Sequence, residues 1–374
     1  MSIRVPENIL EIKPYVPGKP IEELERELGI AQSIKLASNE NPLGASPMAL
    51  AALRDAIGNL HRYPDGSGHA FIRDLADHLD CPPGAIVMGN GSDDIIALLA
   101  NTLLRPGERA VMPQPSFLMY EIAVRSVGAE PVFVPLQSLA IDLDGMRRAV
   151  DEKTRLIFLC NPNNPTGTVI NGDDFDRFLA ALPLDVVVVV DEAYIEFVRD
   201  ADCLQSKAYW GGGRSVVTLR TFSKLYGLAG LRVGYSVSAP GIAEILDRVR
   251  QPFNVNSAAQ AAALASLEDG DYLARSVETN RLGLEQLRAG CRALQLDYIP
   301  SVGNFLTVDV GRDGGELWDG HLEAAVTGDR KLLRRAMLTD PIVNNIGDAD
   351  AIIADLLEAE RDALPSYWYK RGRK

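Results

Sequence analysis

A predicted buried strand that runs into a polar turn gives the clearest structural signal in the chain. The segment is Leu219-Arg220-Thr221-Phe222-Ser223-Lys224-Leu225-Tyr226-Gly227-Leu228-Ala229-Gly230-Leu231-Arg232-Val233-Gly234-Tyr235. The residues from Ser215 to Leu219 are rich in β-branched side chains and predict the strand. Lys224 follows this strand and Phe222, which indicates that its ammonium group points into a cleft. Partial desolvation there favours a neutral amine, which can attack carbonyl groups.

Strands and helices alternate on both sides of this segment. The predicted strands are residues 86–88, 110–112, 131–135, 156–159, 186–190, 215–219 and 235–238. Helical patterns lie between most of them, and the strand at 186–190 is all valine, as expected for a strand buried on both faces. The pattern predicts an α/β fold, a three-layer large domain with a mostly parallel seven-stranded sheet.

The two ends of the chain differ from this alternating region. Prolines interrupt residues 1–40, which predicts an N-terminal arm that joins a small domain. Residues 41–255 form the predicted large domain. After Asn256 come two long alanine-containing helices, a strand near 304–310 and a final helix near 348–364. Residues 256–374 therefore predict a smaller C-terminal α+β domain.

Composition excludes several classes of function. The chain has 374 residues, a net charge of −13 and a pI near 4.9, which argues against nucleic-acid and anionic-membrane partners. Four scattered cysteines favour a reduced cytoplasmic protein over a disulfide scaffold or a zinc site. The four histidines share no metal-binding spacing, and we expect no metal. No secretory signal or membrane-spanning run is evident, which predicts a soluble, cytoplasmic protein.

Polar clusters follow the predicted strands at their carboxyl ends. They are Gly91–Asp94, Ser116–Phe117, Asn161–Gly167, Asp191–Tyr194 and Thr221–Lys224. Ligands of open α/β sheets bind outside the carboxyl ends of the strands. We therefore expect these clusters to form one site.

One part of that site is suited to a phosphate group. Residues Gly89–Asp93 lie between a strand and a helix, where free backbone N–H groups and the helix dipole attract anions. No third glycine follows at the spacing that a dinucleotide site needs. Thr221, Ser223 and Arg232 add hydroxyl and guanidinium donors.

The remaining residues are suited to an aromatic cofactor. Asp191 ends the all-valine strand, where a buried carboxylate is costly unless it is paired with a cation. Phe117 can stack on a planar ring. Together with Lys224 and the phosphate cradle, these side chains describe a site for pyridoxal 5'-phosphate.

These residues resemble the fold type I pyridoxal-phosphate-dependent aminotransferases, and within them the histidinol-phosphate aminotransferases. The matching segments keep the family's order from about residue 10 to residue 310. They are Ser38–Pro42, Arg62–Pro64, Gly89–Asp93, Asn161–Gly167, Asp191–Tyr194 and Thr221–Arg232.

The resemblance implies a role for each cofactor residue. Lys224 holds the cofactor as an aldimine and moves a proton during catalysis, Asp191 keeps the pyridine nitrogen protonated, and Asn164 and Tyr194 bond the ring oxygen. Phosphate binding falls to groups around Gly91, Ser92 and Asp93, with Thr221, Ser223 and Arg232, while Phe117 stacks on the ring. The resemblance also implies a homodimer, with Tyr63 reaching the neighbouring subunit's cofactor and Tyr15 and Asn41 lying near the substrate.

The chain departs from the family pattern beyond about residue 320. The family carries two arginines there that bind the anionic ends of the substrate, whereas Val343 stands here where the carboxylate arginine is expected. Arg334 and Arg335 lie nearby and are our candidates to replace it.

We therefore expect a transaminase that works by a ping-pong mechanism on histidinol phosphate and 2-oxoglutarate in histidine biosynthesis. Three alternatives remain open. They are an aromatic amino-acid aminotransferase, a lyase similar to threonine-phosphate decarboxylase, and a catalytically impaired homologue that still binds the cofactor.

Overall fold

A seven-stranded sheet forms the centre of the computed structural model, which describes residues 3–15, 18, 20–28, 38–309 and 342–343. The strands are β1 (Ile86–Gly89), β2 (Arg109–Gln114), β3 (Glu130–Pro135), β4 (Thr154–Cys160), β5 (Val187–Asp191), β6 (Val216–Thr221) and β7 (Gly234–Ser238). Their order across the sheet is β1-β7-β6-β5-β4-β2-β3. Only β7 runs antiparallel to its neighbours. The predicted mostly parallel sheet is confirmed.

Helices cover both faces of this sheet. They are α4 (His69–Leu79), α5 (Ser92–Leu103), α6 (Met119–Ser126), α7 (Leu143–Arg148), α8 (Gly172–Ala180) and α9 (Pro240–Asp247), and beside α4 lie α10 (Ser257–Leu267) and α3 (Pro47–Ile57). Along β4, Leu156 and Phe158 join the apolar cluster under α5, α6 and α9. Ile157 and Leu159 join the cluster under α7 and α8. The alternation follows from the two-residue period of a strand, and it explains why the central strands are almost continuously apolar.

Several strands extend one or more residues beyond the ranges expected from the sequence, and some elements were not predicted. Helix α5 begins at Ser92, and Asp93 and Asp94 occupy its first turn, where carboxylates are favoured. Helix α9 was not predicted, although Pro240 at its first position is a start signal. Strand β8 (Asp297–Ile299) was not predicted either, because it is too short to give a recognisable pattern.

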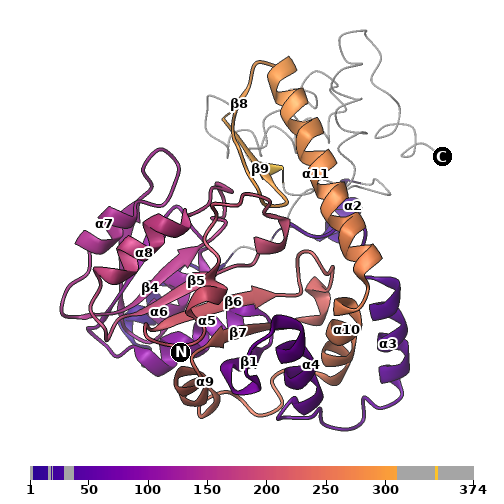
Figure 1. Cartoon of the computed structure of the whole chain (residues 1–374), viewed down its shortest axis with the longest axis horizontal. Coiled ribbons are helices and arrows are strands. Elements are labelled where there is room, and N and C mark those ends of the chain that lie inside the picture. The colour runs from indigo at the N-terminus through magenta and orange to yellow at the C-terminus, as the bar shows by residue number, and fades with distance from the viewer. Residues whose placement is uncertain (1–2, 16–17, 19, 29–37, 310–341, 344–374) are drawn as a thin grey trace.

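A second, smaller sheet follows the long helix α11 (Gly270–Ala293). It has the order β10-β9-β8, with β9 (Leu306–Asp309) between β8 and β10 (Ile342–Val343). Figure 1 shows α11, β8 and β9 projecting from one corner of the large sheet. Helix α10 packs on α3 and α4, which belong to the predicted large domain. The domain limits at residues 40 and 255 remain predictions.

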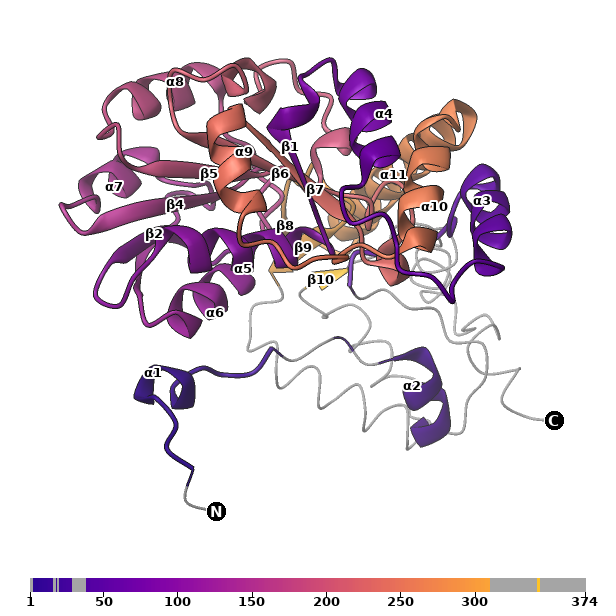
Figure 2. The same ribbon diagram turned by 90° about the horizontal axis from the view of Figure 1, so that it is seen from below.

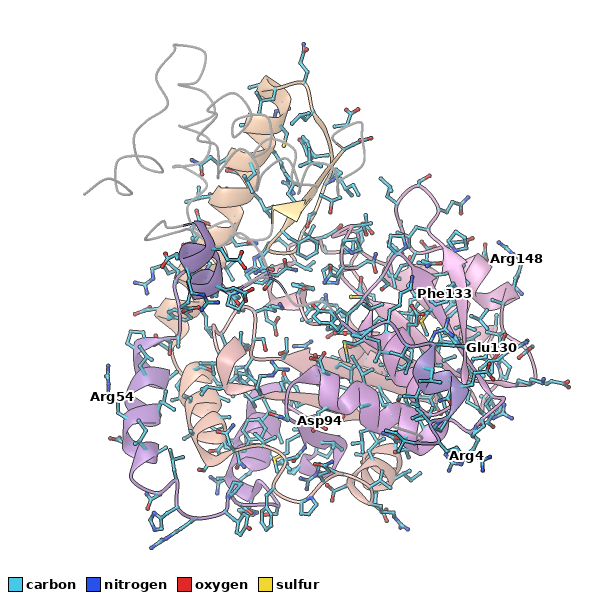
Figure 3. The ribbon with its side chains drawn as sticks, turned by 180° about the vertical axis from the view of Figure 1, so that it is seen from behind. Arg4, Arg54, Asp94, Glu130, Phe133 and Arg148 are labelled. Carbon is cyan, nitrogen blue, oxygen red and sulfur yellow. The ribbon has the colours of Figure 1, made fainter. Side chains whose placement is uncertain are left out.

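The N-terminal segment crosses the lower side of the molecule in Figure 2, where α1 (Glu7–Leu10) and α2 (Ile21–Leu28) are visible. The side-chain amide of Asn8 donates to the carbonyl oxygen of Arg125 at 2.8 Å, which ties α1 to α6. Figure 3 shows Arg54 of α3 and Arg148 of α7 on opposite sides of the molecule. None of the helices in the described ranges has the length and apolarity needed to cross a membrane.

Candidate functional site

Lys224 lies in the connection between β6 and β7, at the carboxyl end of β6. Its Nζ donates to the carbonyl oxygen of Ser38 at 3.1 Å and lies 5.5 Å from the centroid of the Tyr194 ring. Burial lowers the pKa of Lys224 to about 8, because desolvation penalises the ammonium form, while Glu40 and Asp93 partly oppose this effect. An amine with this pKa can exchange a proton near neutral pH.

Asp191 ends β5 and is 2% exposed. Its Oδ2 accepts a hydrogen bond from the hydroxyl of Tyr120 at 2.7 Å, and its Oδ1 accepts one from the backbone N–H of Ala193 at 3.2 Å. Burial raises the pKa of Asp191 to about 6, although the bond from Tyr120 opposes the rise. Across residues 38–309, no lysine or arginine forms a salt bridge with Asp191. Two neutral donors hold a buried acid that has no cationic partner in this part of the chain.

Tyr194 accepts two amide hydrogen bonds at its phenol oxygen. Asn39 donates from 2.8 Å and Asn164 from 3.2 Å. Burial raises the pKa of Tyr194, so the phenol stays protonated at neutral pH. Both donated hydrogens point to the same oxygen, which leaves the phenol's own hydrogen available to a third group. Asn164 and Tyr194 are thus brought together as the sequence predicts.

The start of α5 forms a cup of backbone N–H groups. Gly91 has φ +83°, and a Cβ atom at this position would collide with the guanidinium group of Arg232. A Cβ atom on Gly234 of β7 would lie 2.8 Å from the backbone nitrogen of Ser92. These two positions therefore need glycine if the cup is to sit against the β6–β7 connection.

Charged and hydroxyl groups surround this cup. Arg232 pairs with Asp93 at 3.3 Å, and burial raises the pKa of the Asp93 carboxyl. The hydroxyl of Thr221 donates to that of Ser223 at 3.0 Å, and both side chains are buried. The combination of free N–H groups, a guanidinium and hydroxyls is suited to a phosphate.

Phe117 follows β2 and lies at the same edge of the sheet. Its ring meets that of Tyr120 edge-on, with centroids 5.6 Å apart and an interplanar angle of 85°. The neighbouring Ser116 hydroxyl donates to Asn163 Oδ1 at 2.9 Å, which joins the loop after β2 to the loop after β4. Two more of the predicted clusters therefore meet.

Other predicted residues have different surroundings. Tyr63 is 84% exposed and stacks on Phe253, with ring centroids 4.9 Å apart. Tyr15 is half exposed in the N-terminal segment. Asn41 uses its amide to donate to the Leu225 carbonyl at 2.7 Å, so it braces the turn after Lys224. Arg334 and Arg335 lie outside the described residues, and their roles stay predictions.

Several residues at this edge of the sheet were not predicted from the sequence. Asn39 lies in the segment Ser38–Pro42 but had no predicted role; its Nδ2 donates to Tyr194, and among the described residues its buried Oδ1 has no hydrogen-bond partner. Tyr120 lies three residues after Phe117, a spacing that could have suggested a shared helical face. Glu192 forms an ion pair with Arg220 on the opposite face of the sheet from Asp191.

Comparison with known proteins adds independent information. A model of the family described as aminotransferase class I and II matches residues 31–339. A histidinol-phosphate aminotransferase of Pseudomonas aeruginosa is 49% identical over 320 residues, which cover 85% of this chain and 87% of the relative. One from Pseudomonas fluorescens is 47% identical over 338 residues, covering 90% and 88%. The crystal structure of histidinol-phosphate aminotransferase from Sinorhizobium meliloti, in complex with pyridoxal-5'-phosphate, superposes with a TM-score of 0.80 at 28% identity, covering 96% of this chain and 98% of that one.

Proposed function

Because the chain belongs to the class I and II aminotransferase family, we propose that it is a pyridoxal-phosphate-dependent transaminase. Its proposed substrates are histidinol phosphate and 2-oxoglutarate, the pair expected in histidine biosynthesis, and its mechanism is ping-pong. The observation that carries the proposal is the position of Lys224, whose pKa is lowered to about 8. Its Nζ lies 5.5 Å from the centroid of the Tyr194 ring and interacts electrostatically with the buried acid Asp191, while the Tyr194 phenol accepts two amide hydrogen bonds.

The residues present fit this cofactor. Asp191 is buried and lacks a cationic partner within residues 38–309, and a protonated pyridine nitrogen would supply one. The cup formed by Gly91, the first turn of α5 and Arg232 would hold the phosphate. Phe117 would supply a ring face. When it is bound, pyridoxal phosphate supplies an electron-withdrawing ring that stabilises negative charge developing at the substrate Cα.

The protein groups around that ring have separate tasks. Lys224 accepts and returns a proton at its Nζ, which its lowered pKa permits near neutral pH. Asp191 would support the positive charge of the ring nitrogen. The phenol of Tyr194 has its own hydrogen left to donate to the ring oxygen, because Asn39 and Asn164 already donate to it. The phosphate would be held by Arg232, Thr221, Ser223 and the N–H groups near Ser92 and Asp93.

Support for the substrate comes from the relatives. Two relatives that are 47% and 49% identical over most of the chain carry the name histidinol-phosphate aminotransferase. Tyr15 and Asn41 are proposed to lie near the substrate, and Arg334 and Arg335 to bind an anionic end of it.

We also propose that the enzyme is a homodimer with shared sites. Tyr63 is 84% exposed and held by Phe253 in a position open to a second chain. Apolar side chains exposed on and near α3 include Met48, Leu50, Ile57 and Leu60. A surface of this kind is typical of an interface between copies. The four cysteines are unpaired, which supports our proposal of a reducing cytoplasmic location.

Absorbance spectroscopy tests the function directly. The purified protein with pyridoxal phosphate is expected to absorb near 420 nm, a band that shifts towards 330 nm when histidinol phosphate or glutamate is added. Lys224→Ala should lose both the band and the half-reactions. Carbon dioxide release from a phosphorylated amino acid would instead indicate a decarboxylase. A normal band without any half-reaction in a panel that includes aromatic amino acids would indicate an impaired homologue.

A further inference from the structure

Helix α6 places a buried tyrosine directly against Asp191. Tyr120 is 0% exposed, and its hydroxyl donates to Asp191 Oδ2 at 2.7 Å. The Tyr120 ring is restrained by Phe158 of β4, on which it stacks with centroids 4.8 Å apart and an interplanar angle of 9°. Packing of the ring therefore fixes the position of the Tyr120 hydroxyl.

The same ring also supports the predicted stacking residue. Phe117 meets Tyr120 edge-on at 5.6 Å. One side chain thus contacts both the acid that would pair with the pyridine nitrogen and the ring that would cover it. The inference drawn from these two contacts rests on the proposed function.

We propose that Tyr120 is a positioning residue for the cofactor. Its hydroxyl orients the Asp191 carboxylate and keeps it ionised, so that the acid is ready to pair with a protonated pyridine nitrogen. Its ring fixes the place of Phe117. Tyr120 itself touches neither substrate nor cofactor in this role and acts through these two neighbours.

The electrostatic surroundings of Asp191 explain why such a donor matters. Burial is the main cause that raises the pKa of this acid to about 6, and the hydrogen bond from Tyr120 opposes this rise most strongly. The other titratable groups that interact with Asp191 lie on several elements; they are Asp93 on α5, Cys160 at the end of β4, Glu192, Tyr194 and Lys224. Asp93 and Glu192 add to the rise. Without the Tyr120 hydroxyl, we expect Asp191 to stay protonated to a higher pH.

Tyr120→Phe removes the hydroxyl and keeps the ring. A protonated Asp191 must release its proton before it can pair with a cationic ring nitrogen, so cofactor affinity should fall where the acid is neutral. We expect the dissociation constant for pyridoxal phosphate, titrated into apoenzyme, to rise about tenfold near pH 6.5, as for a lost hydrogen bond to a charged group. The difference from wild type should shrink towards pH 8.5. A ratio that does not change with pH would contradict the proposal.

A second readout needs no cofactor. In the folded apoenzyme an acid with a raised pKa contributes stability at low pH that is lost as the pH rises through its folded value. The melting temperature of Tyr120→Phe should therefore fall further below wild type as the pH rises from 5 to 8. The trend should vanish in the Tyr120→Phe/Asp191→Asn double variant. Persistence of the trend in that variant would overturn the link to Asp191.

A matched control and an opposite perturbation complete the test. Tyr209 donates to Asp176 at 2.5 Å and packs on the face of the sheet opposite to Tyr120, so Tyr209→Phe should leave cofactor affinity unchanged at every pH. If Tyr120→Phe does not fold, 3-fluorotyrosine at position 120 replaces it. This more acidic phenol should shift the onset of weak cofactor binding to lower pH, and an unchanged onset would count against the proposal.

If wild type binds no pyridoxal phosphate at all, the proposed function fails, and the apoenzyme melting series still decides whether Tyr120 controls the pKa of Asp191.

Discussion

Two neighbouring acids at the end of β5 are held in opposite ways. Asp191 faces the α6 side of the sheet, where Tyr120 and a backbone N–H group hold it. Glu192 follows it and is fully buried on the other side, where Nε and one terminal nitrogen of Arg220 donate to its Oε2 at 2.9 and 2.7 Å. Successive residues of a strand point to opposite faces, so one chain segment supplies both environments.

The difference shows how the protein separates stability from function. Glu192 has its cation within the chain, and the ion pair links the ends of β5 and β6. Asp191 is similarly buried but forms no salt bridge within residues 38–309, and burial raises its pKa. Glu192 contributes to the folded state through its ion pair, whereas we propose that Asp191 is available to a ligand that brings a positive charge.

Breaking the ion pair should have the largest effect on stability. Glu192→Gln leaves the Arg220 guanidinium, whose side chain is 17% exposed, without its carboxylate. Loss of one partner of a buried pair costs about 3 to 5 kcal/mol, which urea denaturation can measure. The Glu192→Leu/Arg220→Met double variant should recover part of this loss, and equal instability of the single and double variants would contradict the explanation.

Neutralising the other acid should affect activity instead. Asp191→Asn removes the carboxylate that would support the ring nitrogen, and the half-reaction rate should fall roughly a hundredfold to a thousandfold, as when a group that stabilises developing charge is lost. Stopped-flow absorbance with saturating cofactor measures it. The apoenzyme should melt no earlier than wild type at pH 8, because the substitution removes a buried charge. Early melting would show that Asp191 also has a structural role.

The pH dependence of apoenzyme stability should also distinguish Asp191 from Glu192. The folded pKa of Asp191, about 6, lies above its ordinary value of 3.8. Its contribution to stability is present below pH 4 and is lost as the pH rises through 6, by about 3 kcal/mol at most. Asp191→Asn should lack this loss when both proteins are unfolded with urea between pH 4 and pH 8. If the free energies of unfolding of wild type and Asp191→Asn change with pH in the same way, the pH dependence comes from other groups.

The smallest expected effect concerns the phenol beside Lys224. Asn39→Ala removes one of two donors to Tyr194 and should cost about 1 kcal/mol, or a fivefold to tenfold lower half-reaction rate. Asn164→Ala should act in the same direction. Asn101→Ala is a suitable control, because the Asn101 amide donates only to the carbonyl of Ala97 within α5 and is exposed. A control that slows the reaction equally would point to a general loss of stability.

The parts of the site that lie at the ends of strands could be predicted from the sequence. Lys224, Asp191 and the Gly91 turn each follow an apolar run, so their shared edge could be predicted from parallel topology alone. The contact of Tyr120 with Asp191 could not be predicted, because it depends on how α6 crosses β5. Asn39 contacts Tyr194 across 155 residues of chain and does so from a left-handed turn, with φ 52°, that no local pattern specifies.

The antiparallel direction of β7 has a consequence for how the site assembles. Thr221 pairs with Gly234, so residues 222–233 leave and re-enter the sheet at the same edge. A parallel strand would have needed a crossover, which would send the chain to the far edge before it returned. Lys224 and Arg232 therefore belong to one short connection, closed by the bond from Phe222 N–H to the Val233 carbonyl at 3.1 Å. The separation between the Lys224 amine and the Arg232 guanidinium therefore depends on the conformation of this single connection, rather than on the packing of two distant segments.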